Sequence, residues 1–175
     1  RPNDMYEFEP EKRVWRIWSS KSAPKPGTEM AVTSWGRRIF IHGGFTEVLG
    51  NLQDTDGFHV FDPLESESSL WASYDGLLRG SAPSARAFHG MVSIANMLFV
   101  FGGSNPQGTS QGWLHDMYSF NYSSLQWRTM SNSFPGSPLG RGNFGMVSLG
   151  SSIFVFGGEG GNASGGLYFL AVLSL

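Results

Sequence analysis

Leu98-Phe-Val-Phe-Gly102-Gly103 is a run of bulky apolar residues that stops at two glycines, and the chain contains the same pattern twice more. The other copies are Ile39-Phe-Ile-His-Gly43-Gly44 and Ile153-Phe-Val-Phe-Gly157-Gly158. A run without polar alternation is typical of a strand that is covered on both faces. A glycine after such a strand allows a positive φ or a close approach of another backbone. The pattern therefore predicts three equivalent buried strands.

The sequence around these strands repeats as well. Residues 22–44 align with residues 81–103 without a gap, at an offset of 59. The segment from Arg86 to Ser93 returns between Arg141 and Ser148, at an offset of 55. Tryptophans recur every 56 residues, at Trp15, Trp71 and Trp127. Self-similarity at a fixed period predicts an architecture built from repeated units.

One period of the repeat reads as four short strands, at about residues 88–94, 97–101, 117–120 and 125–130. The composition agrees with strands rather than helices, since 24 of the 175 residues are glycine and 14% are aromatic. Glycine lowers helix stability and is common in tight turns between strands. We expect an all-β fold of four-stranded antiparallel units.

These features resemble the kelch repeats of β-propellers, in which an apolar strand ends in Gly-Gly and a tryptophan closes each unit. The resemblance covers nearly the whole chain and implies a ring of four-stranded blades. The chain has too few residues to close such a ring, so we expect an incomplete propeller. Its expected parts are the last two strands of a blade (1–20), two whole blades (21–79 and 80–134) and the first strands of a further blade (135–175).

The residues expected to build this scaffold occupy repeated positions. They are Gly43, Gly44, Gly102, Gly103, Gly157, Gly158, Trp15, Trp71, Trp127, Arg86 and Arg141. The two arginines share one repeat position, which favours a structural ion pair with Asp116 or Asp56 over catalysis. The chain departs from the pattern at two places, because Gly27 stands where the other units have arginine and the last unit lacks a tryptophan strand.

Several chemical functions are disfavoured by composition and motif context. A net charge of −2 and the lack of basic clusters disfavour nucleic-acid binding, and the lack of cysteine excludes thiolate ligands and cysteine nucleophiles. Residues 140–145 fit G-x-G-x-x-G, but a strand follows them instead of the helix that a dinucleotide site needs. Residues 54–57 resemble part of a calcium loop, but the twelfth position of that loop would be Pro63, which cannot coordinate the ion.

We therefore predict no catalytic residue, cofactor or metal ligand. His42 and His89 align with apolar residues of the other units, which predicts that both histidines are packed in the core.

Binding residues of propellers concentrate on loops carried by the rigid scaffold. The loops after the Gly-Gly strands, at residues 45–55, 104–115 and 159–166, are long and contain few charges. Together with one shared position just before the first strand, they supply the expected ligand-facing residues. These are Glu29, Phe88, Asn143, Asn105, Gln107, Trp113 and Glu159.

The sequence favours a protein-interaction module, with a protein or peptide ligand, no nucleic acid and no membrane span. One form would be a substrate-recognition part of a larger multidomain protein, such as a ubiquitin-ligase adaptor; the other blades would then belong to the same parent chain. The alternatives are a propeller belonging to a carbohydrate-acting enzyme, or an extracellular propeller glycosylated at Asn121 and Asn162. The lack of cysteine fits a reducing, cytoplasmic setting but leaves the location open.

Overall fold

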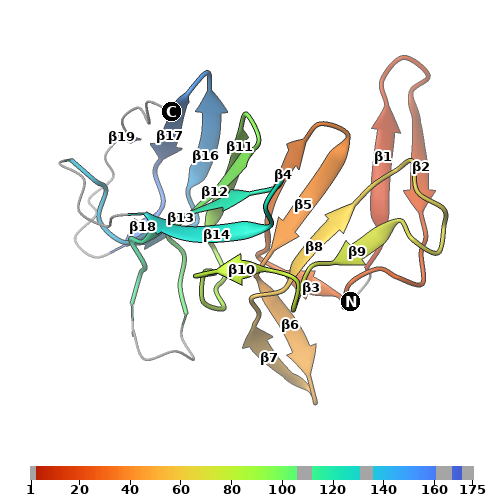
Figure 1. The fold of residues 1–175 in the computed structure, drawn as a ribbon, viewed down its shortest axis with the longest axis horizontal. Helices are drawn as coiled ribbons and strands as arrows, with labels where there is room; N and C mark the ends of the chain where they lie inside the picture. The colour runs from red at the N-terminus through yellow and green to blue at the C-terminus, as the bar shows by residue number, and fades with distance from the viewer. Residues whose placement is uncertain (1–2, 106–111, 131–135, 161–166, 171–175) are drawn as a thin grey trace.

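The computed structural model describes residues 3–105, 112–130, 136–160 and 167–170, and all regular structure in these segments is β-strand (Figure 1). The strands form antiparallel sheets that follow one another along the chain, and the described residues form no closed ring. None of the described residues forms a helix long and apolar enough to cross a membrane. The expected class, an all-β segment of an incomplete propeller, is confirmed.

The longer strands form four successive sheets, which we call units. The first unit is a hairpin of β1 (Met5–Glu9) and β2 (Val14–Trp18). The second is a sheet of β4 (Ala31–Trp35), β5 (Arg38–His42), β8 (Phe58–Phe61) and β9 (Trp71–Ser73). The third contains β11 (Gly90–Ile94), β12 (Met97–Phe101), β13 (Met117–Asn121) and β14 (Gln126–Met130). The fourth contains β16 (Gly145–Leu149), β17 (Ser152–Phe156) and β19 (Leu167–Leu170).

The remaining described strands lie beside these sheets or between the units. They are β3 (Gly27–Thr28), β6 (Phe45–Val48), β7 (Asn51–Asp54), β10 (Arg79–Gly80), β15 (Arg141–Gly142) and β18 (Glu159–Gly160). Strand β10 runs parallel to β14 and adds a fifth strand to the third unit.

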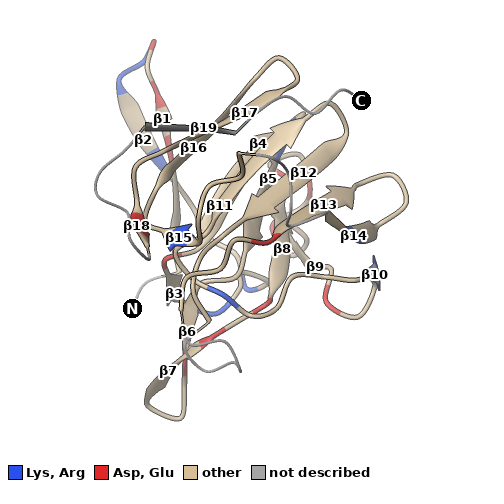
Figure 2. Cartoon of the chain, turned by 90° about the vertical axis from the view of Figure 1, so that its left-hand side faces the viewer, with Lys and Arg blue, Asp and Glu red and all other residues tan. Residues whose placement is uncertain are grey.

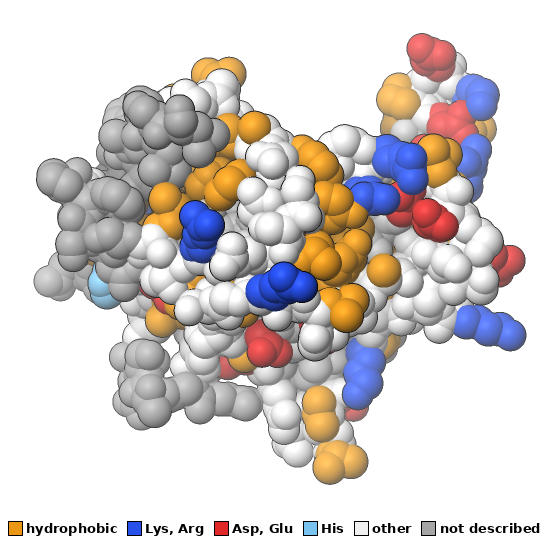
Figure 3. Space-filling model, viewed as in Figure 1, with side chains coloured by type: hydrophobic (Ala, Val, Ile, Leu, Met, Phe, Trp, Pro, Cys, Tyr) orange, Lys and Arg blue, Asp and Glu red, His pale blue; other side chains and the backbone are white. Residues whose placement is uncertain are grey.

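The segment from residue 45 to residue 55, which we expected to be a loop, contains the hairpin of β6 and β7. The hairpin projects from the sheets in both ribbon views (Figures 1 and 2). Its two turn residues, Leu49 and Gly50, both have positive φ, at 51° and 81°. Two consecutive residues with positive φ form a tight turn whose twist matches the twist of the two flanking strands. Leu49 is 96% exposed at the tip, where Figure 3 shows hydrophobic side chains.

The second and third units have the same strand register. Ile39 pairs with Phe61 in the second unit, as Leu98 pairs with Phe120 in the third. An offset of 59 residues therefore relates equivalent positions in the first three strands of the two units. This equivalence allows the two units to be compared residue by residue.

The hydrophobic core lies mainly between neighbouring units. One cluster joins Phe40 and Phe58 of the second unit to Leu98, Phe120 and Trp127 of the third. A second cluster joins the third unit to the fourth. Strand β12, which has a neighbour on each side, is buried along almost its whole length. In the fourth unit Phe156, which is equivalent to the buried Phe101, is 65% exposed. Burial of these strands therefore comes from the adjacent sheets.

Each repeated tryptophan packs on the aromatic residue opposite it in its own unit. The ring centroids are 5.0 Å apart for Phe8 and Trp15, 5.1 Å for Phe61 and Trp71, and 4.9 Å for Phe120 and Trp127. Trp71 and Trp127 are also buried, each in a cluster that joins two units. Trp15 differs, because it is 67% exposed on β2. Trp15 was expected to be a scaffold residue, but the ring contacts that it makes in the described part of the chain are with Tyr6 and Phe8 of its own hairpin.

The glycine pairs bring neighbouring units into backbone contact. Gly43 and Gly44 have φ of 67° and 88°, and the Gly44 amide donates a hydrogen bond to the Arg86 carbonyl at 2.7 Å. A Cβ at Gly43 would lie 2.5 Å from that carbonyl oxygen. The second pair behaves alike, because the Gly103 amide donates to the Arg141 carbonyl at 2.8 Å. Glycine is required here because it adopts a positive φ easily and because a Cβ would collide with the backbone of the next unit.

We predict that Gly43→Ala destabilises the chain much more than Gly36→Ala. Both glycines have positive φ, but a Cβ at Gly36 would meet nothing within 4 Å. Gly36→Ala should therefore lower the free energy of unfolding by about 1 kcal/mol, the cost of the backbone conformation alone. Gly43→Ala adds a collision with backbone and should cost about 3 kcal/mol or more. Urea unfolding of both variants measures the difference, and equal losses would contradict the role assigned to the glycine pair.

Candidate ligand face

Glu29, Phe88 and Asn143 form a row across three units, which we call the inner row. All three have left-handed backbone, with φ of 56°, 61° and 55°. The Phe88 amide donates to the Glu29 carbonyl at 3.3 Å, and the Asn143 amide donates to the Phe88 carbonyl at 3.1 Å. The shared repeat position thus becomes a continuous line of backbone hydrogen bonds from unit to unit.

The inner row lies at the start of the first strand of each unit. These first strands, β4, β11 and β16, contact one another across the units, and the Ser93 hydroxyl of β11 donates to the Ser34 carbonyl of β4 at 2.7 Å. The turns at the other end of these strands contain Gly36, Ala95 and Gly150. The inner row and the turns therefore mark two opposite ends of the assembly (Figure 1).

Aromatic side chains accompany the inner row. The ring centroid of Phe88 is 5.5 Å from that of Phe45 and 6.3 Å from that of Trp113. Trp113 packs so closely on Gly142 that a Cβ there would lie 2.1 Å from the indole ring. The three rings form one aromatic cluster from separate parts of the chain. Phe45 begins β6, Phe88 precedes β11, and Trp113 lies in the loop before β13.

The structure brings together most of the expected ligand-face residues that it describes. Glu29 and Asn143 are exposed, and Phe88 and Trp113 are half-buried. Glu159 is exposed in β18, where it pairs with Gly142, the residue before Asn143. Asn105 is half-buried beside Ser104, which bridges to Trp113. Gln107 lies outside the described residues.

Phe45 was missed by the sequence reasoning. It follows directly on Gly44, at the position that Glu159 occupies after Gly158. This equivalence to Glu159, which was expected to face the ligand, was the sequence signal that could have identified Phe45. The aromatic contact with Phe88 depends on how two units pack, which the repeat alone does not reveal.

Arg86 belongs to the scaffold. It is fully buried, and its two terminal nitrogens donate to the Asp116 carboxylate at 2.7 and 2.9 Å. It also donates to the carbonyls of Gly102 and Ser84, and its guanidinium lies 5.2 Å from the centre of the Tyr118 ring. Of the two expected acidic partners, Asp116 is the one that it contacts. Arg141 makes the equivalent bonds to the carbonyls of Leu139 and Gly157.

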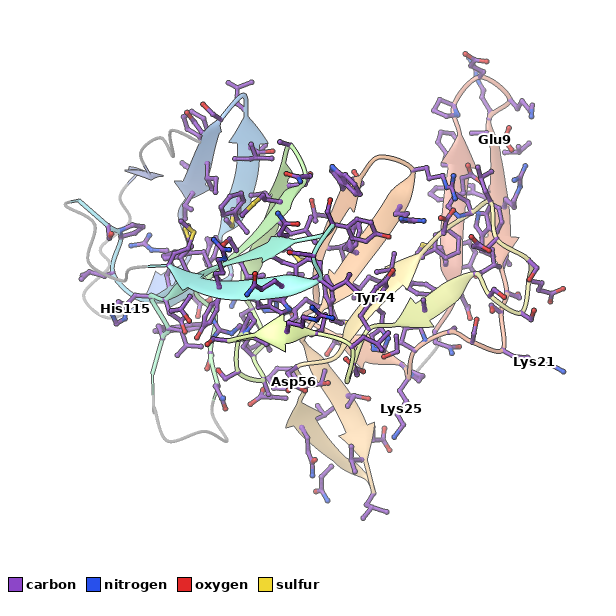
Figure 4. All side chains as sticks on the ribbon, in the orientation of Figure 1. Glu9, Lys21, Lys25, Asp56, Tyr74 and His115 are labelled. Atoms are coloured by element: carbon purple, nitrogen blue, oxygen red, sulfur yellow. The ribbon has the colours of Figure 1, made fainter. Side chains whose placement is uncertain are left out.

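We predict that Asp116→Ala lowers the free energy of unfolding by about 3 kcal/mol, because it leaves the buried Arg86 guanidinium without its counter-ion. Glu9→Ala is the control, since Glu9 pairs with Lys12 and Arg16 on the exposed β1–β2 hairpin (Figure 4). Exposed pairs contribute little to stability. Chemical denaturation should therefore separate the two variants clearly, and equal stabilities would rule out a structural role for the Arg86 pair.

His42 and His89 form a buried pair between the second and third units. Nδ1 of His42 lies 3.0 Å from Nε2 of His89, and the two rings meet edge to face at 5.0 Å between centroids. The expectation that both are packed core histidines is confirmed. Burial lowers the pKa of His42 to about 3 and also holds the pKa of His89 well below its ordinary value. The pair is therefore neutral in the folded chain near neutral pH.

This pair makes stability depend on pH. Below about pH 6.5 the unfolded chain takes up protons on both imidazoles, whereas the folded chain resists protonation. Stability present above pH 6.5 is therefore lost as the pH falls toward 3, at up to about 2.7 kcal/mol per pH unit for two histidines. Replacing the pair by phenylalanine, as at the equivalent Phe101 and Phe144, should flatten this dependence.

The double variant His42→Phe/His89→Phe tests this prediction. Unfolding free energies of the wild type and the variant are measured in urea at several pH values between 7 and 4. The difference between the two curves should grow in favour of the variant as the pH falls. Parallel curves would show that the two histidines do not control the acid sensitivity.

Metal-binding groups are not clustered in the parts of the chain that the structure describes. No group of three or more histidine, aspartate or glutamate side chains there could hold a metal ion. At the predicted glycosylation sites, Asn121 ends β13 and accepts a hydrogen bond from the Ser124 amide at 3.1 Å. Asn162 lies outside the described residues.

Comparison with known proteins supports the repeat assignment. A family model described as the KLHDC2/KLHL20/DRC7 Kelch-repeats domain matches residues 1–174. The flagellar outer-arm dynein alpha chain of Chlamydomonas reinhardtii is 28% identical over 150 residues, which is 85% of this chain and 3% of that protein. Kelch-like protein 22 of Mus musculus is 36% identical over 80 residues, which is 46% of this chain and 12% of that protein.

One similar protein is named as an enzyme. The N-(sulfonatooxy)prop-2-enimidothioate sulfolyase of Thlaspi arvense is 26% identical over 163 residues, which is 89% of this chain and 44% of that protein. The chain thus spans less than half the length of each of these three relatives.

Proposed function

Because the chain belongs to the kelch-repeat family, we propose that it is a protein-interaction module that binds its ligand on the face carrying the inner row. One observation carries the proposal. At the inner row the backbone is the same in three units, but the side chains are Glu29, Phe88 and Asn143. A repeated backbone that presents an acid, an aromatic ring and an amide can match a specific ligand without any change to the scaffold.

The surroundings of the inner row suit a protein or peptide ligand. The cluster of Phe45, Phe88 and Trp113 offers aromatic surface, and Glu29 and Glu159 add acidic groups at its edge. Aromatic side chains contribute strongly to binding energy at protein interfaces. The side chains at the repeated scaffold positions, by contrast, are used for contacts within and between units.

A more specific form of the proposal is that the chain recognises substrates for a larger multidomain protein, such as a ubiquitin-ligase adaptor. The lengths of the matched relatives support the larger setting, since their similar segments are small parts of longer proteins. The alternative is a propeller that carries the active site of an enzyme, which the sulfolyase relative favours. An enzyme would act on a small molecule with no protein partner, so the two proposals predict different results.

The proposal predicts that a photo-crosslinking amino acid captures the ligand protein from the inner row only. A benzophenone-bearing phenylalanine at position 29 or 143 should form a discrete adduct, because the equivalent residue Phe88 shows that the position accepts an aromatic side chain. Trp113→Ala should weaken binding of the captured protein about tenfold or more. The adducts are identified by mass spectrometry and the affinities by titration.

The same amino acid at positions 96 and 151 is the control, because Asn96 and Ser151 are exposed in turns at the opposite end of the first strands. Adducts of equal yield at both ends would contradict a ligand face at the inner row. Turnover of a small molecule without any specific adduct would favour the enzyme instead.

A further inference from the structure

The second and third units differ most sharply at the arginine position. In the third unit five residues surround or form the buried arginine site: Arg86 itself, Ser84, Gly102, Asp116 and Tyr118. At an offset of 59, the equivalent residues of the second unit are Gly27, Lys25, Gly43, Gly57 and His59. The second unit thus lacks the arginine, its carboxylate and the tyrosine ring at once, although its strands keep the same register.

A pocket lies at this place in the second unit. It has a volume of about 290 Å³, and all five equivalent residues line it. Gly27 remains paired with Thr46 in the short sheet of β3 and β6, so the backbone keeps its place. Pockets for drug-sized ligands usually start near 300 Å³, so this volume suits a single side chain.

The walls of the pocket offer groups that accept hydrogen bonds. The Gly43 carbonyl is equivalent to the Gly102 carbonyl, which accepts a hydrogen bond from Arg86 at 3.0 Å. Asp75 also lines the pocket and supplies a carboxylate from a different segment, after β9. This carboxylate is held in position, because it accepts hydrogen bonds from the Phe58 amide at 3.0 Å and the Ser73 hydroxyl at 2.7 Å.

His59 supplies the ring in place of Tyr118. Burial lowers the pKa of His59, and the negative charge of Asp75, which lines the same pocket, opposes this shift. A neutral imidazole does not repel a cation. Lys25 also lines the pocket but is exposed, and Figure 4 shows its side chain extending outward from the chain.

We propose that this pocket binds the guanidinium group of an arginine side chain supplied by another protein. The third unit shows the chemistry, since the same backbone frame there holds a guanidinium with a carbonyl, a carboxylate and an aromatic ring. Arginine is favoured over lysine because a planar guanidinium can stack on the His59 ring while it donates to two acceptors. None of the three inner-row residues lines the pocket, although Phe45 of the aromatic cluster does. The variants below leave Phe45 unchanged, so they test the pocket separately from the inner row.

The test uses methylguanidinium and the peptide acetyl-Gly-Arg-Gly-amide as probes, with methylammonium and the lysine peptide as matched controls. Titration of the 175-residue chain is followed by NMR of the His59 ring. Methylguanidinium and the arginine peptide should shift the His59 signals in a saturable way, and the two ammonium probes should bind about tenfold more weakly or not at all.

Three variants assign the binding to the pocket. Asp75→Asn should weaken binding of the arginine peptide about tenfold, because it removes the carboxylate. Gly57→Asp should strengthen it, since the variant restores the acid found at Asp116. The nearest atoms to a Cβ at Gly57 would be in the His59 and Thr55 side chains, at 3.0 and 3.2 Å, so these side chains would have to shift by a few tenths of an ångström. Lys25→Ser should also strengthen binding, by removing a positive charge at the rim.

Two further variants control for charge alone. Asp56→Asn removes a nearby exposed carboxylate that does not line the pocket (Figure 4), and Gln53→Glu adds one on β7; neither should change the affinity for the arginine peptide. Equal binding of guanidinium and ammonium probes would overturn the proposal, as would unchanged affinity in Asp75→Asn. If Asp75→Asn does not fold, Gly57→Asp and Lys25→Ser decide, and the proposal fails if neither tightens binding.

Discussion

The hydrogen bond from the second glycine of the first two Gly-Gly pairs to the arginine-position carbonyl of the next unit is the contact on which the arrangement depends. It places Gly44 against Arg86 and Gly103 against Arg141, at 2.7 and 2.8 Å. The same approach fixes the start of each first strand, and hence the line of backbone bonds through Glu29, Phe88 and Asn143. Because the contact is made by backbone, side chains nearby are free to differ between units.

The side chains at the interfaces between units do differ. In each interface, the last residue of one unit's second strand packs on the residue before the first strand of the next unit. Between the second and third units these residues are the hydrogen-bonded His42 and His89, and between the third and fourth they are the apolar Phe101 and Phe144. The two pairs have similar ring separations, 5.0 and 5.7 Å, so the geometry is kept while the chemistry changes. A histidine pair adds sensitivity to acid that a phenylalanine pair lacks, because only the imidazoles gain protons on unfolding.

Sequence reasoning predicted those parts of the fold that the repeat encodes. The strands that end in Gly-Gly and the all-β class follow from residues at fixed offsets. The hairpin at Leu49 and Gly50 was missed, because the dipeptide Leu-Gly at its turn does not resemble the Asn-Gly that usually marks such turns. The exposure of Trp15 was also missed, since the sequence pattern says which residues pack within a unit but not what lies beside it.

The loss of the arginine at Gly27 shows what such a scaffold tolerates. A buried ion pair contributes little net stability beyond the cost of removing its charges from water, so a unit that loses both partners together gives up less than one that loses a single partner. In the second unit Gly27 and Gly57 replace both members of the pair, which leaves no unmatched charge at those two positions. The backbone contacts that hold the unit are unaffected, since Gly44 still bonds to Arg86 and Gly27 still pairs with Thr46. A site that served stability in one unit can therefore serve recognition in another.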